Sequence, residues 1–110
     1  MTEIDIFRDK QGNIVKFVCD GHTDYAEEGQ DIVCAAVSSV AFAVLNGIEN
    51  VLHVDFGYET GDGYLFFVLP EDIEETERKN INILLDTMYL FFKETEQQYP
   101  GNIQISELEV

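Results

Sequence analysis

Two stretches with helical spacing interrupt a chain whose apolar residues otherwise alternate, and this order constrains the fold more than any other feature. Residues 2–7 place Ile4 and Ile6 on one side and acidic residues on the other, which predicts a strand. Residues 9–13 have the composition of a turn, and residues 14–19 predict a second strand. The beginning of the chain therefore predicts a β-hairpin.

The first helical pattern covers residues 32–50, where apolar side chains recur every three or four positions. Its main stripe consists of Val33, Val37, Val40, Val44 and Ile48, and Ala36, Ala41, Ala43 and Leu45 widen it. An apolar face this wide indicates a helix that packs on more than one side. Asn46 and Gly47 weaken the helix near its end.

A second pair of strand patterns follows. Apolar and polar residues alternate in residues 51–59, which predicts a third strand. Its apolar members are Leu52, Val54 and Phe56. Residues 60–63, Thr-Gly-Asp-Gly, predict a tight hairpin turn. The unbroken apolar run of residues 64–69 predicts a central, well-buried strand that Pro70 ends.

The second helical pattern begins after the acidic residues 71–77, which suit the positive end of a helix dipole. Its apolar stripe consists of Ile81, Leu84, Leu85, Met88, Phe91 and Phe92. Residues 99–102 stop the helix, and the alternation of Ile103 and Ile105 with polar residues predicts a last strand. We interpret the stripe as packing in a core, not as a cofactor site.

The resulting order, ββαββαβ, predicts an α+β fold. We expect two hairpins and a C-terminal strand to form a mixed, mostly antiparallel sheet, with both helices packed against it. Residues 1–110 are expected to form one domain, because a chain of this length can bury a sizeable core.

The charge balance limits the possible partners. Twenty-two acidic residues against six basic ones give a net charge of −16. Nucleic acid is an unfavourable partner, because its binding depends on clustered Lys and Arg. A basic partner is favoured, since long-range attraction raises encounter rates. Acidity that only maintains solubility is the alternative interpretation.

The rest of the composition predicts a cytoplasmic protein without a cofactor. No apolar run looks long enough to span a bilayer, and residues 1–5 do not resemble a signal peptide. Two cysteines do not indicate a disulfide framework in a cytosolic chain. We expect no metal site, because the two Cys and two His are spread along the chain.

The stretch from Gly21 to Ser39 carries the candidate chemistry. Asp31 is the expected N-cap, so Cys34 would be the third helical position. Helix N-termini lower the pKa of cysteines, and His22 on the preceding loop could fold back toward the sulfur. The pattern suggests a cysteine nucleophile with a histidine base. The alternative is that Cys34 is a small buried apolar residue among alanines and valines.

Other residues have weaker candidate roles. Ser38 follows Cys34 by one helical turn and could hydrogen-bond in the site or to its own helix backbone. Tyr25, in the loop of residues 20–30, could cover the site or contact a peptide. His53 is a second candidate base, which we rank below His22. Cys19, near the end of a predicted strand, is interpreted as packing.

These residues carry a family resemblance. Gly21-His22, Tyr25-Ala26, Gly29 and residues 31–38, Asp-Ile-Val-Cys-Ala-Ala-Val-Ser, closely resemble the signature of the bacterial ribosomal-processing cysteine protease family, Prp. The likeness extends over nearly the whole chain.

The resemblance implies an endopeptidase that removes the N-terminal extension of large-subunit ribosomal protein twenty-seven, a basic substrate, during ribosome assembly. It maps Cys34 to the nucleophile and His22 to its base. Gly21, Asp31 and Ser38 match supporting motif positions, and Tyr25 and Gly29 fall in a loop that would contact substrate. The family likeness also suggests a homodimer.

Two rival functions remain open at this point. A non-catalytic acidic module could dock a basic ribosomal protein or assembly factor, with Cys34 only packing. A thiol redox switch could use Cys34 and Cys19, which requires the two sulfurs to approach each other.

Overall fold

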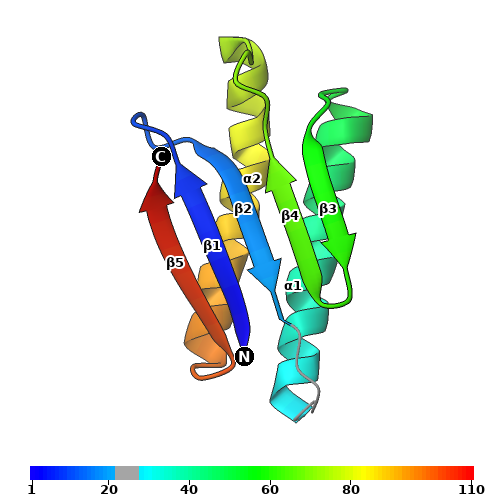
Figure 1. Cartoon of the computed structure of the whole chain (residues 1–110), viewed down its shortest axis with the longest axis vertical. Coiled ribbons are helices and arrows are strands. Elements are labelled where there is room, and N and C mark those ends of the chain that lie inside the picture. Colours follow the sequence, from blue (N-terminus) through cyan, green and yellow to red (C-terminus); the bar gives the residue numbers. More distant parts are fainter. Residues whose placement is uncertain (22–27) are drawn as a thin grey trace.

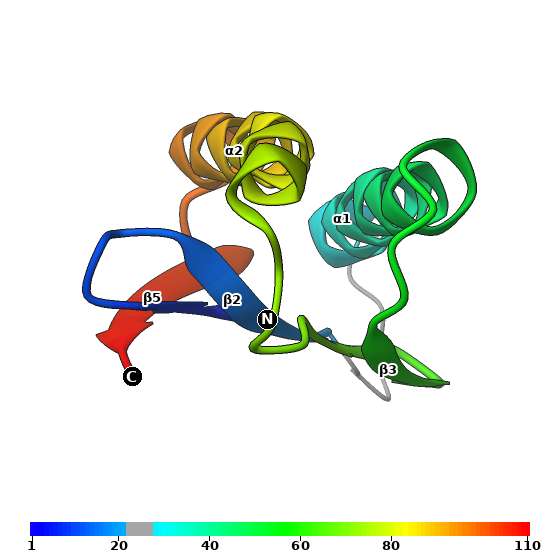
Figure 2. The same cartoon turned by 90° about the horizontal axis from the view of Figure 1, so that it is seen from above.

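Two helices cover one face of a five-stranded sheet and leave the other face open (Figures 1 and 2). The computed structural model describes residues 1–21 and 28–110, and of residues 28–31 it describes only the backbone. The elements are β1 (Thr2–Arg8), β2 (Ile14–Asp20), α1 (Glu28–Asn46), the π-helical η1 (Gly47–Val51), β3 (Gly57–Gly61), β4 (Tyr64–Val68), α2 (Glu75–Gln98) and β5 (Ile103–Glu109). The predicted α+β class and element order are confirmed.

The sheet has the strand order β3-β4-β2-β1-β5. Four strands join through antiparallel pairs, whereas β5 lies parallel to β1 at the other edge. Both predicted hairpins, β1–β2 and β3–β4, are present. The second turns at Asp62-Gly63, where Gly63 has a φ of 69°, a left-handed conformation that favours glycine.

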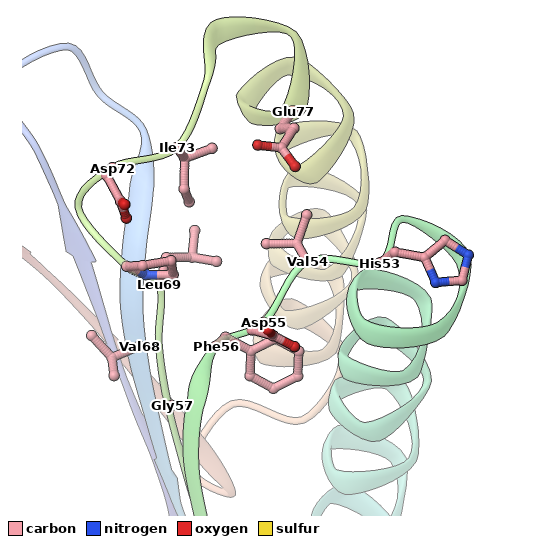
Figure 3. A pocket seen from close by; sticks show the side chains of 11 residues that line it. His53, Val54, Asp55, Phe56, Gly57, Val68, Leu69, Asp72, Ile73 and Glu77 are labelled. Carbon is pink, nitrogen blue, oxygen red and sulfur yellow. The ribbon is translucent and has the colours of Figure 1, made fainter.

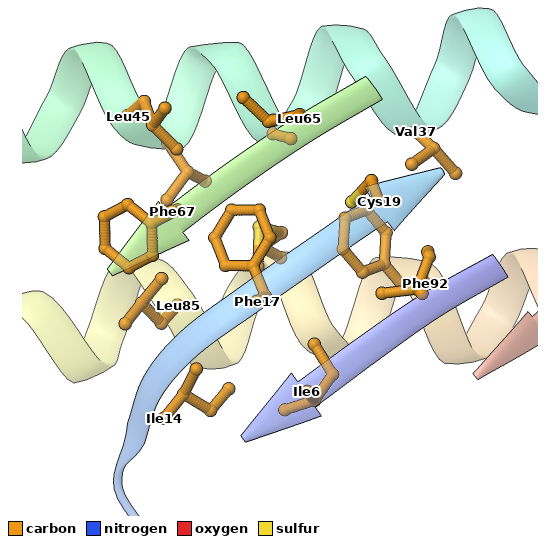
Figure 4. Close-up of a cluster of buried hydrophobic side chains, with 14 of the residues drawn as sticks. Ile6, Ile14, Phe17, Cys19, Val37, Leu45, Leu65, Phe67, Leu85 and Phe92 are labelled. Carbon is orange, nitrogen blue, oxygen red and sulfur yellow. The ribbon is translucent and has the colours of Figure 1, made fainter. Parts of the chain in front are cut away.

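The core lies between the helices and the covered face of the sheet (Figure 4). Phe17 of β2 and Phe67 of β4 stack there with their ring centroids 4.9 Å apart. The predicted stripes of both helices meet these rings, and their most buried members are Val33, Val37, Ala41, Ile48, Ile81, Leu85, Met88 and Phe92. Helical and two-residue periodicities therefore converge on one apolar layer, as the sequence pattern predicts.

The third strand is shorter and later than predicted. The prediction covered residues 51–59, but β3 spans only Gly57–Gly61. His53 has a φ of 57°, which is incompatible with a strand, and Val54 donates its backbone N–H to the carbonyl of Ile48 at 3.0 Å. Val51 is still helical, and residues 52–56 turn the chain after the end of η1. Val54 is nonetheless buried, so the alternating pattern reports burial without strand pairing.

The fourth strand is central, as predicted, but it is buried on one face only. Leu65 and Phe67 point into the core, while Tyr64, Phe66 and Val68 belong to the open face. There the Lys16 ammonium lies 4.4 Å from the Phe7 ring centroid and 5.6 Å from that of Phe66. A cation with an apolar stem partly covers this open aromatic surface.

The apolar length of the first helix was underestimated. Residues Ile32–Val51 have a mean hydropathy of 1.8 and are long enough to cross a bilayer by length and composition. In the structure Val33, Val37, Ala41, Val44 and Ile48 of this segment face the sheet and α2. Their packing explains the apolar residues on the buried face of the helix, whereas Ile32, Phe42 and Val51 of the same segment are exposed.

The core predicts a matched contrast on α2. Leu85→Ala should lower the free energy of unfolding by about 2–5 kcal/mol, because Leu85 is fully buried and its loss leaves a cavity. Leu90→Ala makes the same chemical change at a position that is 62% exposed, and should alter stability by no more than about 0.5 kcal/mol. Urea denaturation followed by circular dichroism measures both, and equal losses would contradict this core.

Candidate active site

Cys34 lies near the beginning of α1, at the end of the sheet where β2 finishes and the β3–β4 hairpin turns (Figure 1). It is half-buried and lines a cavity of about 50 Å³. The cavity is bounded by the first residue of β1, the end of β2, the β3–β4 hairpin and α1. A small, partly open cavity of this kind gives a solvent molecule or a substrate atom access to the thiol.

Gly21 forms one wall of this cavity and lies directly against the Cys34 thiol. Its N–H donates to the Gly63 carbonyl at 2.7 Å, which extends the β2–β4 pairing by one residue. A Cβ atom at position 21 would lie 3.0 Å from both Cys34 Sγ and Thr2 Oγ1. Glycine at this position therefore leaves a notch between β1 and α1 that the thiol occupies.

The predicted helix start is wrong. α1 begins at Glu28, so Asp31 lies inside the helix and is not its N-cap, and Gly29 is helical instead of belonging to a loop. Cys34 is consequently the seventh residue of α1, beyond the first turn, where the dipole effect is strongest. An N–H at this position of an α-helix donates to the carbonyl four residues back. The free N–H groups of the first helical turn could stabilise an oxyanion, but Cys34 lies beyond that turn. Its own N–H is therefore not one of these free groups.

The structure tests the remaining predicted site residues unevenly. Ser38 lines the same cavity as Cys34, in agreement with their spacing of one helical turn. His22 and Tyr25 lie outside the described residues. Sequence reasoning did not assign several other cavity residues to the site, among them Thr2, Phe42 and Tyr64. Of these, only Phe42 has a signal in the sequence that could have indicated its place, because it is an aromatic residue beside the main apolar stripe of the helix.

Cys19 contrasts sharply with Cys34. Its side chain points from β2 into the core, on the side that Val37 of α1 also enters (Figure 4). It is only 6% exposed. Burial raises the pKa of the Cys19 thiol to about 12, and the negative charges of Cys34 and Asp5 add to the shift. Cys19 thus stays a neutral thiol near pH 7, and its assignment as a packing residue is confirmed.

The second candidate base, His53, belongs to a different part of the molecule. It borders a cavity of about 530 Å³ formed with the segment after β4 and the start of α2 (Figure 3). Its ring points away from the Asp55, Asp72 and Glu77 carboxylates around that cavity. At about 1.5 Å per helical residue, His53 is roughly 25 Å along the helix from Cys34. It cannot act as the base for that thiol within one chain.

Among the side chains that the structure describes, those of residues 1–21 and 32–110, no group of three or more His, Cys, Asp or Glu is arranged to hold a metal ion. The chemistry available at the Cys34 cavity, as far as the structure describes it, is that of two thiols, Cys34 and Cys19, and of the hydroxyl-bearing residues Thr2, Ser38 and Tyr64.

Comparison with known proteins identifies the family. The family model described as cysteine protease Prp matches residues 1–104. The chain belongs to the Prp family of cysteine proteases. Relatives named ribosomal processing cysteine protease Prp are 29% identical in Bacillus subtilis strain 168 and 31% identical in Staphylococcus aureus strain NCTC 8325. Each alignment covers 96% of this chain, and 96% and 98% of the relative, respectively.

Solved Prp structures share the fold. The Staphylococcus aureus protease in complex with a substrate peptide superimposes with a TM-score of 0.85 at 27% identity, covering 97% of this chain and 99% of that one. The same protease with a covalently linked product peptide gives a TM-score of 0.76 at 26% identity, with the same coverage. The Prp fold therefore extends over nearly all of this chain.

The two thiols should differ in reactivity. Iodoacetamide near neutral pH should label Cys34 first, because Cys34 is half-buried whereas Cys19 is buried and has a pKa of about 12. Peptide mapping by mass spectrometry gives the order of labelling. In urea both thiols should react at similar rates, which serves as the control. Faster labelling of Cys19 in the folded chain would contradict the assignment.

The notch at Gly21 yields a second prediction. Gly21→Ala should slow the alkylation of Cys34, because the added methyl group would lie 3.0 Å from Sγ and must displace it. Gly61→Ala is the matched control, since Gly61 lines the same cavity but its nearest neighbour, Tyr64 Cβ, would be 3.9 Å away. The rate of Cys34 alkylation in each variant is measured by quenching the reaction at successive times. Equal rates would show that the notch does not hold the thiol.

Proposed function

We propose that this protein is a ribosomal-processing cysteine endopeptidase with Cys34 as its nucleophile and His22 as its base. Its substrate would be the N-terminal extension of large-subunit ribosomal protein twenty-seven, cleaved in the cytoplasm. The full-length match to the Prp family supports the activity. The observation that carries the choice of nucleophile is the difference in exposure between the two thiols, because Cys34 is half-buried whereas Cys19 is only 6% exposed.

In this mechanism the Cys34 thiolate attacks the scissile carbonyl carbon and forms a thioester, and water then hydrolyses it. His22 would take the thiol proton and later give it to the leaving amine. The pairing is supported by sequence position, because Gly21 lies against Cys34 Sγ and directly precedes His22. Asp31 remains a candidate third member, and its position inside α1 removes the competing role of N-cap.

The charge of the chain favours the proposed substrate class. Ribosomal proteins are basic as a class, and a net charge of −16 attracts a cationic substrate over long range. The same attraction would serve a non-catalytic docking module, so charge does not separate the two functions. Cleavage of the precursor does separate the two functions.

A homodimer, which the family likeness suggests, is also part of the proposal. Sedimentation of the protein in solution tests it.

The decisive experiment incubates the protein with the precursor of the ribosomal protein from the same organism and sequences the N-terminus of the product. Cys34→Ala should abolish cleavage while the melting temperature changes little, because Cys34 is half-buried and small. An acidic docking module would instead bind the precursor without cutting it. Continued cleavage by Cys34→Ala would refute the nucleophile assignment.

The two histidines provide a matched test of the base. His22→Asn should lower kcat strongly, by about 100-fold or more, because a general acid–base group contributes at least that much. His53→Asn should leave cleavage unchanged, since His53 is at the far end of the helix and asparagine tolerates its left-handed backbone. A strong loss in His53→Asn, or none in His22→Asn, would overturn the proposed dyad.

A further inference from the structure

The two cysteines of the chain border the same small cavity from different elements. Cys19 reaches it from β2, and Cys34 reaches it from α1. Both are free thiols in this structure. They approach from the two layers of the fold, so a bond between them would tie the helix to the sheet at the position of the proposed nucleophile.

Gly21 explains how the two thiols come to share a cavity. The pairing of β2 with β4 continues to Gly21, so positions 19 and 21 face the same side of the sheet. The Cys34 sulfur lies 3.0 Å from the place where a Cβ of residue 21 would be. It therefore overhangs the strand surface from which Cys19 projects, and no side chain at position 21 separates the two.

The two thiols differ in accessibility in the way that a stepwise oxidation requires. Cys34 is half-buried at the cavity, so a small oxidant can reach it from solvent. Cys19 is 6% exposed and is shielded from direct attack. The charge of Cys34 also contributes to the raised pKa of Cys19, which reflects their proximity. Oxidation should therefore begin at Cys34, with Cys19 as the nearby reduced thiol.

We propose that Cys19 is a resolving cysteine, which converts peroxide-oxidised Cys34 into a reversible Cys19–Cys34 disulfide. In the first step the Cys34 thiolate attacks hydrogen peroxide: an S–O bond forms, the O–O bond breaks, and hydroxide leaves. Sulfur is oxidised by two electrons to the sulfenic acid while the peroxide is reduced. In the second step Cys19 sulfur attacks Cys34 sulfur: the S–S bond forms, the S–O bond breaks, and the hydroxyl leaves as water with the Cys19 proton.

The disulfide would occupy the nucleophile and so stop cleavage until a dithiol reduces it. It would also protect the nucleophile. A sulfenic acid that meets no second thiol is oxidised further to the sulfinic acid, which small thiols do not reduce. The buried Cys19, which the hydrolytic mechanism does not use, would thus preserve the activity through oxidative stress.

The test measures the oxidation state of the two cysteines and needs no cleavage assay. Its outcome is therefore independent of whether the proposed protease activity is correct. The reduced protein is exposed to hydrogen peroxide, quenched with an alkylating agent in denaturant, and analysed by intact mass and peptide mapping. The wild-type chain should lose two hydrogen atoms as a monomer, resist alkylation at both cysteines, and regain both thiols with dithiothreitol.

Cys19→Ala is the matched variant, and Cys19→Ser is a second one that keeps the side-chain volume in case the alanine variant is unstable. In both, peroxide should drive Cys34 to the sulfinic acid, and dithiothreitol should not restore its alkylation. Wild-type Cys34 that reaches the sulfinic acid while Cys19 remains alkylatable would overturn the proposal. A disulfide that joins Cys34 residues of two chains would overturn it as well.

Discussion

The packing of α1 across β2 and β4 determines where the reactive thiol lies. Val33 and Val37 of α1 are almost completely buried against the sheet, and they flank Cys34 along the helix. Because they anchor the helix rotationally, Cys34 comes to the border of the buried face, with its sulfur over Gly21. A different rotation would either bury the thiol as deeply as Cys19 or turn it into solvent away from the cavity.

Much of the fold was predictable because its sheet is covered on one side only. Such a sheet imposes strict alternation on β1 and β2, and the two covering helices carry clear apolar stripes. The alternating pattern predicted a strand wrongly where a residue is buried without the hydrogen bonds of a strand. Residues 52–56 alternate because an irregular segment inserts Val54 into the core, and no strand pairing accompanies that alternation. Strand order across the sheet was also beyond reach, since it depends on long-range pairing that single-sequence periodicity does not encode.

The candidate site was predictable in its chemistry and less so in its geometry. Local sequence identified Cys34 and Ser38, which do share a cavity, and it separated Cys34 from Cys19. The capping preference of Asp31 misplaced the helix start, because capping statistics cannot exclude that a helix continues upstream through residues such as Glu28 and Gln30. Thr2 and Tyr64 come to the cavity through the tertiary fold alone, from the beginning of β1 and the beginning of β4.

The parallel pairing of β1 with β5 has a kinetic consequence. Arg8 and Glu107, which form an ion pair between these strands, are 99 residues apart in the sequence. Closing so large a loop carries an entropic cost that local hairpins avoid, and contacts of this range slow folding. Thr2 pairs with Ile103 in this register and is also a wall of the Cys34 cavity. The last strand therefore supports one wall of the Cys34 cavity from outside, although none of its own residues lines that cavity.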